Sequence, residues 1–171
     1  MDADALRALQ APLKTKYKDD ANAAVLTLRA TGAIDESKIA CKVETGRAIA
    51  EAGLHPLTGG TGAELCSGDM LLEALVACAG VTLKAVSTAL GIDLKAGKVT
   101  AEGDLDFRGT LGVAKDAPVG FSDIRLKFDL ETAASEEQIA QLIKLTERYC
   151  VVFQTLKQSP KSSVLVTTAA G

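Results

Sequence analysis

The segment SGDMLLEALVACAGVTLKAVSTAL, at positions 67–90, constrains the fold more than any other part of the chain. Ser67 is a good helix N-cap, Asp69 stands in the first turn, where the helix dipole favours an acid, and Gly91 follows as a terminating glycine. At about 1.5 Å per residue the segment predicts a helix of roughly 35 Å. Its apolar side chains lie nearly all round the helix, so we expect it at the centre of the fold, covered on every side.

A second long helix is predicted to begin at Ser135, because SEEQ is a capping box with Ser at the N-cap and Gln at the third helical position. The apolar residues that follow recur with the period of one helix face: Ile139, Leu142, Ile143, Tyr149, Cys150 and Phe153. We therefore expect one helix through Phe153, with Cys150 pointing into the core.

Strands are predicted where apolar and polar residues alternate. The clearest case is FSDIRLKFDLET at 121–132, and KVTAEGDLDFRG at 98–109 is a second. Residues 25–28 and 38–44 are predicted to pair as a hairpin, with a turn that begins at Gly32.

Three further segments have recognisable patterns. Residues 2–17 predict a short amphipathic helix that Pro12 ends or kinks, 52–69 predicts a glycine-rich loop at the mouth of a pocket, and 162–169 predicts a final strand. Helices that alternate with hairpins predict an α+β fold with antiparallel sheet packed on helices. The length predicts a single domain over 1–171.

Composition excludes several classes of function. The net charge of -3 disfavours a nucleic-acid partner, because phosphate contacts need a basic surface. The longest apolar run, 74–81, is too short to span a membrane, and the N-terminus resembles neither a secretory signal nor an anchor. We expect a cytoplasmic protein with reduced cysteines. One histidine and four cysteines without a CxxC pair predict no metal and no cofactor.

Cys78 and Cys150 stand out among the cysteines because each lies on a predicted core helix. From the residues alone, two small packed side chains are the more common case, since cysteine is often buried. The other interpretation is a redox pair in which one thiol attacks a peroxide and the second resolves the product as a disulfide.

The other cysteines and the histidine favour ordinary roles. Cys41 faces the core side of its predicted strand. Cys66 precedes the first long helix, where a helix N-terminus can lower a thiol pKa, although a packed loop thiol is the commoner case. His55, beside Pro56 in the loop, is more often a hydrogen-bonding residue than a catalyst.

Two segments resemble the OsmC/Ohr family of thiol-dependent peroxidases: CSGDMLLEALVACAGVTL around Cys78 and TERYCVVFQTLKQSP around Cys150. The order of elements is similar over nearly the whole chain. The resemblance implies an OsmC-like α+β domain in an intertwined homodimer, with antiparallel sheet wrapped around two central helices.

The same resemblance implies the chemistry. Cys78 would attack an organic hydroperoxide and become a sulfenic acid, Cys150 would resolve it as a disulfide, and a dithiol or a lipoylated protein would reduce that disulfide. An apolar lining suits such a substrate. The resemblance also implies a role in the oxidative stress response, with which the family is associated.

The chain departs from the family at the groups that support the thiolate. Ala33 and Gly68 occupy the positions where the family has an arginine and a glutamate. We therefore consider Arg29, Arg47, Asp69 and Glu73 as substitutes, beside their ordinary roles as surface or capping charges. These departures favour an alternative function, a non-catalytic module that binds a small apolar ligand at the dimer interface. A disulfide reductase is disfavoured because CxxC is absent.

Overall fold

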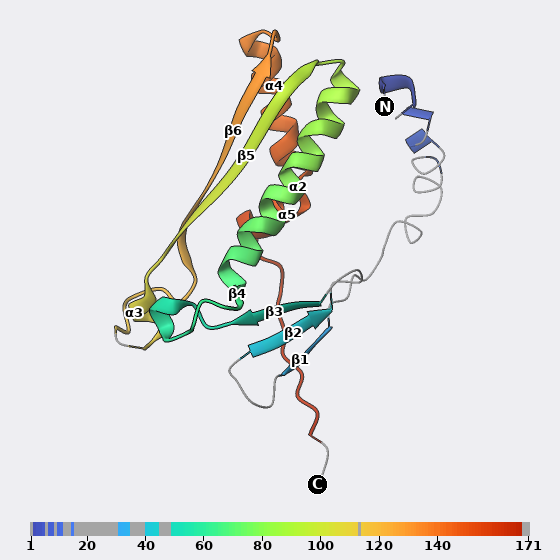
Figure 1. Ribbon diagram of the computed structural model, residues 1–171. Coiled ribbons are helices and arrows are strands. Elements are labelled where there is room, and N and C mark those ends of the chain that lie inside the picture. The colour runs from blue at the N-terminus through green and yellow to red at the C-terminus, as the bar shows by residue number, and fades with distance from the viewer. Residues whose placement is uncertain are drawn as a thin grey trace.

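The structure is a computed structural model, and residues 1–171 are drawn in Figure 1. It describes residues 2–5, 7–8, 10–11, 15, 31–34, 40–44, 49–112 and 114–168, with backbone alone at 31–34, 40–44 and 49. The predicted strand at 25–28, together with Arg29 and Arg47, lies outside the described residues.

Helix α2 (Ser67–Leu90) contacts the strand that follows it and both C-terminal helices, and its bounds are those predicted. It ends where Gly91 adopts a φ of 69°, a left-handed conformation that glycine reaches without strain. Its N-cap is Cys66 rather than the predicted Ser67, and no side chain caps the helix there. One face is buried through residues spaced four apart: Leu75, Ala79, Leu83 and Ser87.

A two-stranded antiparallel ribbon, β5 (Leu94–Leu105) and β6 (Phe121–Thr132), runs alongside α2 (Figure 1). In β6 the alternation of half-buried and exposed residues confirms the predicted strand. Strand β5 begins and ends four residues earlier than predicted, and α3 (Phe107–Thr110) follows it.

Two further helices, α4 (Glu136–Tyr149) and α5 (Val151–Lys157), pack against α2. Ser135 caps α4 through the predicted capping box with Gln138. The prediction of one helix through Phe153 was wrong, because the chain breaks at Cys150, whose ψ of 106° is extended rather than helical. Two core clusters fill the space between the ribbon and these helices, one of them around Leu75, Ala79 and the fully buried Cys150.

A small sheet lies beyond the N-terminal end of α2 (Figure 1). Its strands are β1 (Thr31–Ile34), β2 (Ala40–Glu44), β3 (Ile49–Gly53) and β4 (Leu65–Cys66). Strands β1 and β2 pair antiparallel, so Gly32 lies inside a strand and the predicted turn at Gly32 was wrong. The predicted loop at 52–69 also contains the end of β3, the turn η2 (Pro56–Thr58) and β4, because β3 pairs with both β2 and β4.

The predicted final strand was wrong for the single chain. Residues 162–168 carry no regular structure, and Val164, Leu165 and Val166 are almost fully exposed, Leu165 at 94%. A strand needs a neighbour for its hydrogen bonds, and the two described sheets do not include this segment.

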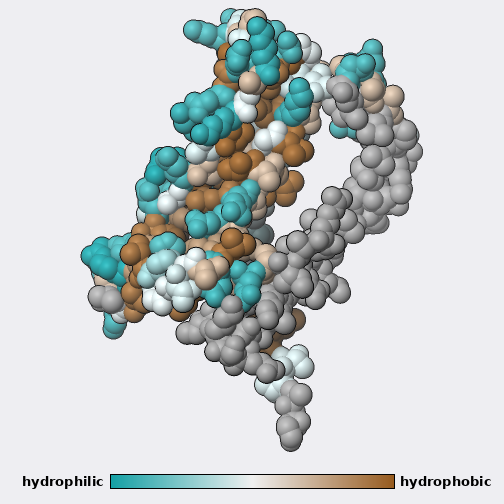
Figure 2. Space-filling model, viewed as in Figure 1, coloured by the Kyte–Doolittle hydropathy of each residue, from teal (hydrophilic) through white to brown (hydrophobic). Residues whose placement is uncertain are grey.

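One face of α2 is also left uncovered. Leu71, Ala74, Ala77 and Val81 recur along one side of the helix and are exposed, Val81 at 73%. Figure 2 shows apolar surface along α2, with polar residues on the side of the β5–β6 ribbon. By length and composition α2 could cross a membrane, which the run at 74–81 did not suggest, but the core helix of a soluble protein passes the same test.

Candidate functional site

Between α4 and α5 the backbone leaves the helical conformation at Cys150, inside the core. The N–H of Cys150 makes the last bond of α4, to the Thr146 carbonyl at 2.9 Å, and the Cys150 carbonyl accepts the first bond of α5, from the Gln154 N–H at 2.9 Å. The break therefore frees the N–H groups of 151–153 from the helix ladder. These N–H groups need other acceptors, and two cysteine sulfurs supply them.

Cys78 on α2 is one of these acceptors, and it packs against the cluster that contains Cys150. Burial on its own raises the pKa of the Cys78 thiol. The opposing effect comes in decreasing order from the Val152 N–H, the Cys150 thiol and the Val151 N–H, which hydrogen-bond the sulfur, and least from Thr82, whose hydroxyl donates to the Cys78 carbonyl. Together these donors hold the pKa of Cys78 below its ordinary value.

Cys150 has the opposite tendency. Burial raises the pKa of the Cys150 thiol, and the neighbouring Cys78 raises it further, while the N–H groups of Phe153 and Val152 lower it by less. Both cysteines are free thiols. The pair is thus asymmetric, with Cys78 the easier thiol to ionise and Cys150 the proton donor to its sulfur.

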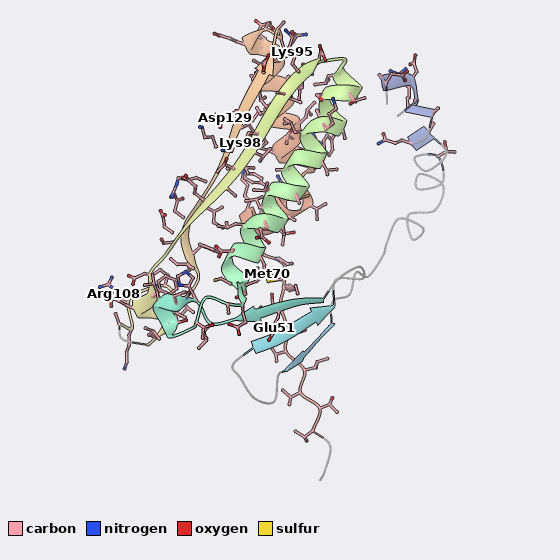
Figure 3. The ribbon with its side chains drawn as sticks, in the orientation of Figure 1. Glu51, Met70, Lys95, Lys98, Arg108 and Asp129 are labelled. Carbon is pink, nitrogen blue, oxygen red and sulfur yellow. The ribbon has the colours of Figure 1, made fainter. Side chains whose placement is uncertain are left out.

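The donors on Cys78 are neutral groups, and the arginines in the described part of the chain are engaged elsewhere. Arg7 pairs with Asp4, Arg108 with Asp106, and Arg125 with Asp104 and Asp123, while Arg148 lies 5.6 Å from the centre of the Tyr149 ring. Figure 3 places Arg108 in α3, near the end of the β5–β6 ribbon. Backbone N–H groups therefore occupy the role that a cation fills at many reactive thiols.

The two acids proposed from the sequence lie on α2 but away from the Cys78 face. Glu73 and Asp69 precede Cys78 by five and nine residues, which places them about 140° and 180° around the helix. Both are exposed, and together with Val76 and Ala77 they line a different surface cavity. Within one chain the structure does not bring them to the Cys78 sulfur.

Cys66 and His55 lie in a second region, at the N-terminal end of α2. They line an apolar cavity of about 380 Å³, and its lining also includes Leu54, Leu71, Leu105, Phe107 and Phe121. The His55 ring stacks on Phe107 at 4.9 Å, and its Nδ1 accepts the Leu57 N–H at 3.1 Å. His55 thus has a structural role as the cap of η2.

Sequence reasoning identified both thiols but missed the groups around them. Val151 and Val152 carry no sequence signal for a backbone donor, and Thr82 looks like an ordinary helix residue whose hydroxyl also bonds the Cys78 carbonyl at 2.8 Å. The one local hint of the break is that two β-branched residues follow Cys150 directly, which weakens helix propensity slightly. In the described part of the chain, no group of three His, Cys, Asp or Glu side chains could hold a metal ion.

Comparison with known proteins gives a family for this arrangement. The family model described as OsmC-like protein matches residues 60–164, which is more than half of the chain and includes both thiols. A search of curated proteins found no match.

Solved structures share the fold at low sequence identity. An OsmC-like protein from Mycoplasma pneumoniae aligns with a TM-score of 0.65 and 17% identity over 78% of this chain and 89% of its own. An organic hydroperoxide resistance protein from Elizabethkingia anophelis aligns at 0.61 and 17%, over 79% and 91%. A protein from Legionella pneumophila described as an organic hydroperoxide resistance protein OsmC aligns at 0.60 and 15%, over 78% and 91%. These alignments confirm the expected α+β, OsmC-like fold.

Proposed function

The chain belongs to the OsmC-like protein family, and from that premise we propose that it is a thiol-dependent peroxidase that reduces organic hydroperoxides. The observation that carries the proposal is the asymmetric thiol pair, in which Cys78 is the more acidic partner and Cys150 hydrogen-bonds its sulfur. The solved structures described as organic hydroperoxide resistance proteins support the choice of substrate.

In the first step the Cys78 thiolate attacks the terminal oxygen of the hydroperoxide. An S–O bond forms and the O–O bond breaks, so the thiolate sulfur is oxidised to a sulfenic acid. The leaving alkoxide takes a proton and departs as an alcohol. Only the thiolate is nucleophilic enough for this attack, and the N–H groups of Val151 and Val152 stabilise it.

In the second step Cys150 loses its proton and attacks the Cys78 sulfur. An S–S bond forms, the S–O bond breaks, and the hydroxyl leaves as water. The raised pKa of Cys150 keeps it protonated, and therefore a donor rather than a competing nucleophile, until Cys78 has been oxidised. An external dithiol or a lipoylated protein then reduces the disulfide by thiol exchange and returns both thiols.

We also propose that the active form is a homodimer. The uncovered apolar face of α2 and the exposed residues 164–166 are both surfaces that a single chain leaves without a partner. A second copy supplies an identical face for α2 and sheet neighbours for the C-terminal segment. Asp69 and Glu73 border the α2 face, so in the dimer they remain candidates for thiolate support, as do Arg29 and Arg47.

The test is to treat reduced protein with one equivalent of cumene hydroperoxide and to map the products by intact mass and peptide mass spectrometry. We expect a rapid loss of two hydrogens that maps to a Cys78–Cys150 link in the wild type and does not occur in Cys78→Ser. If both thiols stay reduced while peroxide persists, the peroxidase assignment fails.

A second candidate function rests on the apolar cavity beside Cys66, which contains neither Cys78 nor Cys150. A non-catalytic module that binds a small apolar ligand needs such a cavity and does not need the thiol pair. Fluorescence titration with a small apolar dye distinguishes the two functions. The binding module predicts unchanged dye affinity in Cys78→Ser and markedly weaker affinity in Leu71→Glu.

A further inference from the structure

Gln154, in the first turn and a half of α5, makes a hydrogen bond that spans the helix break. Its side-chain Nε2 donates to the backbone carbonyl of Glu147 in α4, seven residues earlier, at 2.7 Å, and the contact is partly buried. This hydrogen bond therefore links the two helices on either side of the break.

The acceptor of this hydrogen bond, the Glu147 carbonyl, would have a different partner in a continuous helix. In an uninterrupted helix the Glu147 carbonyl accepts the N–H four residues later, which is that of Val151. In this structure the break turns the Val151 N–H to the Cys78 sulfur instead. The Gln154 amide thus satisfies the carbonyl that the Val151 N–H has left.

We propose that Gln154 is a positioning residue for the Cys78 thiolate. By donating to the Glu147 carbonyl, its amide satisfies an acceptor that would otherwise draw the Val151 N–H back into a continuous helix. Without that amide, a partly buried carbonyl loses its partner, and the backbone recovers one by closing the break.

This inference deepens the proposed function and rests on it, because the thiolate that is positioned is the proposed attacking group. The contact lies within one chain, so the inference does not depend on the dimer. Within the described part of the chain, Cys150 is the titratable group that interacts with the Cys78 sulfur, and its thiol remains in every variant used below.

The experiment measures the rate at which iodoacetamide alkylates Cys78, resolved by peptide mass spectrometry, as a function of pH. The test variants are Gln154→Met, which keeps the length but has no donor, and Gln154→Glu, whose carboxylate repels the carbonyl. The control is Gln158→Met, the same change at an exposed glutamine at the end of α5.

We expect alkylation of Cys78 at neutral pH to slow severalfold in Gln154→Met, because loss of one hydrogen bond to a charged group lowers the thiolate population by about tenfold or more while the more basic thiolate that remains reacts faster. The midpoint of its pH profile should move upward, further in Gln154→Glu, and stay in place in Gln158→Met. Circular dichroism first shows that each variant is folded. Unchanged pH profiles in both folded Gln154 variants overturn the inference.

A wild-type measurement covers the case in which neither variant folds. One Gln154 side-chain amide proton should exchange with solvent much more slowly than those of Gln158, and equal exchange also overturns the inference. Alkylation does not use peroxide, so these results are independent of the peroxidase test. A wild type that fails to form the disulfide while the Gln154 variants shift the profile refutes the function and leaves the positioning role in place.

Discussion

Replacing Val151 by proline removes one hydrogen-bond donor from the Cys78 sulfur and little else. Val151 is the first residue of α5, where proline is well tolerated because its fixed φ suits the helix start. The preceding Cys150 is already extended, as the residue before a proline prefers to be. Val151 is 70% exposed, so the loss of its side chain costs little packing.

The magnitude follows from the lost bond. A hydrogen bond to a charged group contributes about 1.5–3 kcal/mol, and its lower end reduces the thiolate population roughly tenfold at any pH below the titration midpoint. The thiolate that remains is more basic and therefore more nucleophilic, by about threefold for a Brønsted coefficient near 0.4–0.5. We therefore expect the reaction of Cys78 with cumene hydroperoxide to slow about threefold below the midpoint and to match or exceed the wild type well above it.

The assay records the ultraviolet absorbance of the thiolate against pH and the single-turnover rate with cumene hydroperoxide. The matched control is Val151→Ala, which loses the same side chain but keeps the N–H. The midpoint of Val151→Pro should lie above that of Val151→Ala. Equal midpoints in two folded variants would refute the idea that backbone N–H groups stabilise this thiolate.

Three further predictions concern the thiol pair and the dimer. Cys150→Ser, given one equivalent of cumene hydroperoxide, should accumulate a Cys78 sulfenic acid that dimedone traps; an unmodified Cys78 beside persisting peroxide would count against it as the attacking thiol. Val81→Glu places a charge in the uncovered face of α2 and should halve the mass seen by light scattering, whereas Lys84→Glu, at an exposed charged position of the same helix, should not; a Val81→Glu protein of wild-type mass would exclude this face from the interface. Because the pKa of Cys78 is lowered in the folded protein, the unfolded chain binds more protons between that pKa and the ordinary thiol value. The stability that Cys78 contributes is thus complete above the unfolded value and lost as pH falls through the folded one. Urea unfolding should show the difference between wild type and Cys78→Ser widening as pH rises through this window, and a constant difference would contradict it.

The sequence was most informative where local chemistry decides the structure. The ends of α2 followed from a polar start and Gly91, the start of α4 followed from the capping box at Ser135, and β6 followed from strict alternation. In each case the signal lies within a few residues of the feature that it specifies.

Sequence reasoning failed where distant contacts decide the structure. Strand β3, with the sequence IAEAG, has a weak strand propensity and is a strand because β2 and β4 flank it. The break at Cys150 contains no Pro or Gly, and the apolar stripe continues across it at helical spacing. The groups that bond the freed backbone there are a sulfur on α2 and a glutamine amide, neither of which a periodicity can reveal.

The same distinction applies to the candidate site. The two thiols were visible as cysteines on core helices, and the family resemblance paired them. Their inequality was not visible, because it depends on which N–H groups face which sulfur. Asp69 and Glu73 illustrate the converse case, since proximity in sequence to Cys78 does not place them on its side of the helix.

The exposed C-terminal segment makes a newly synthesised chain prone to aggregation. Residues 162–168 read SSVLVTT, which combines high strand propensity with no charge and no proline, the composition of segments that seed cross-β aggregates. Until another strand covers it, this segment is a hazard that grows with protein concentration. Pro160 and Lys161 stand immediately before it, in the position of gatekeeper residues that interrupt such stacking.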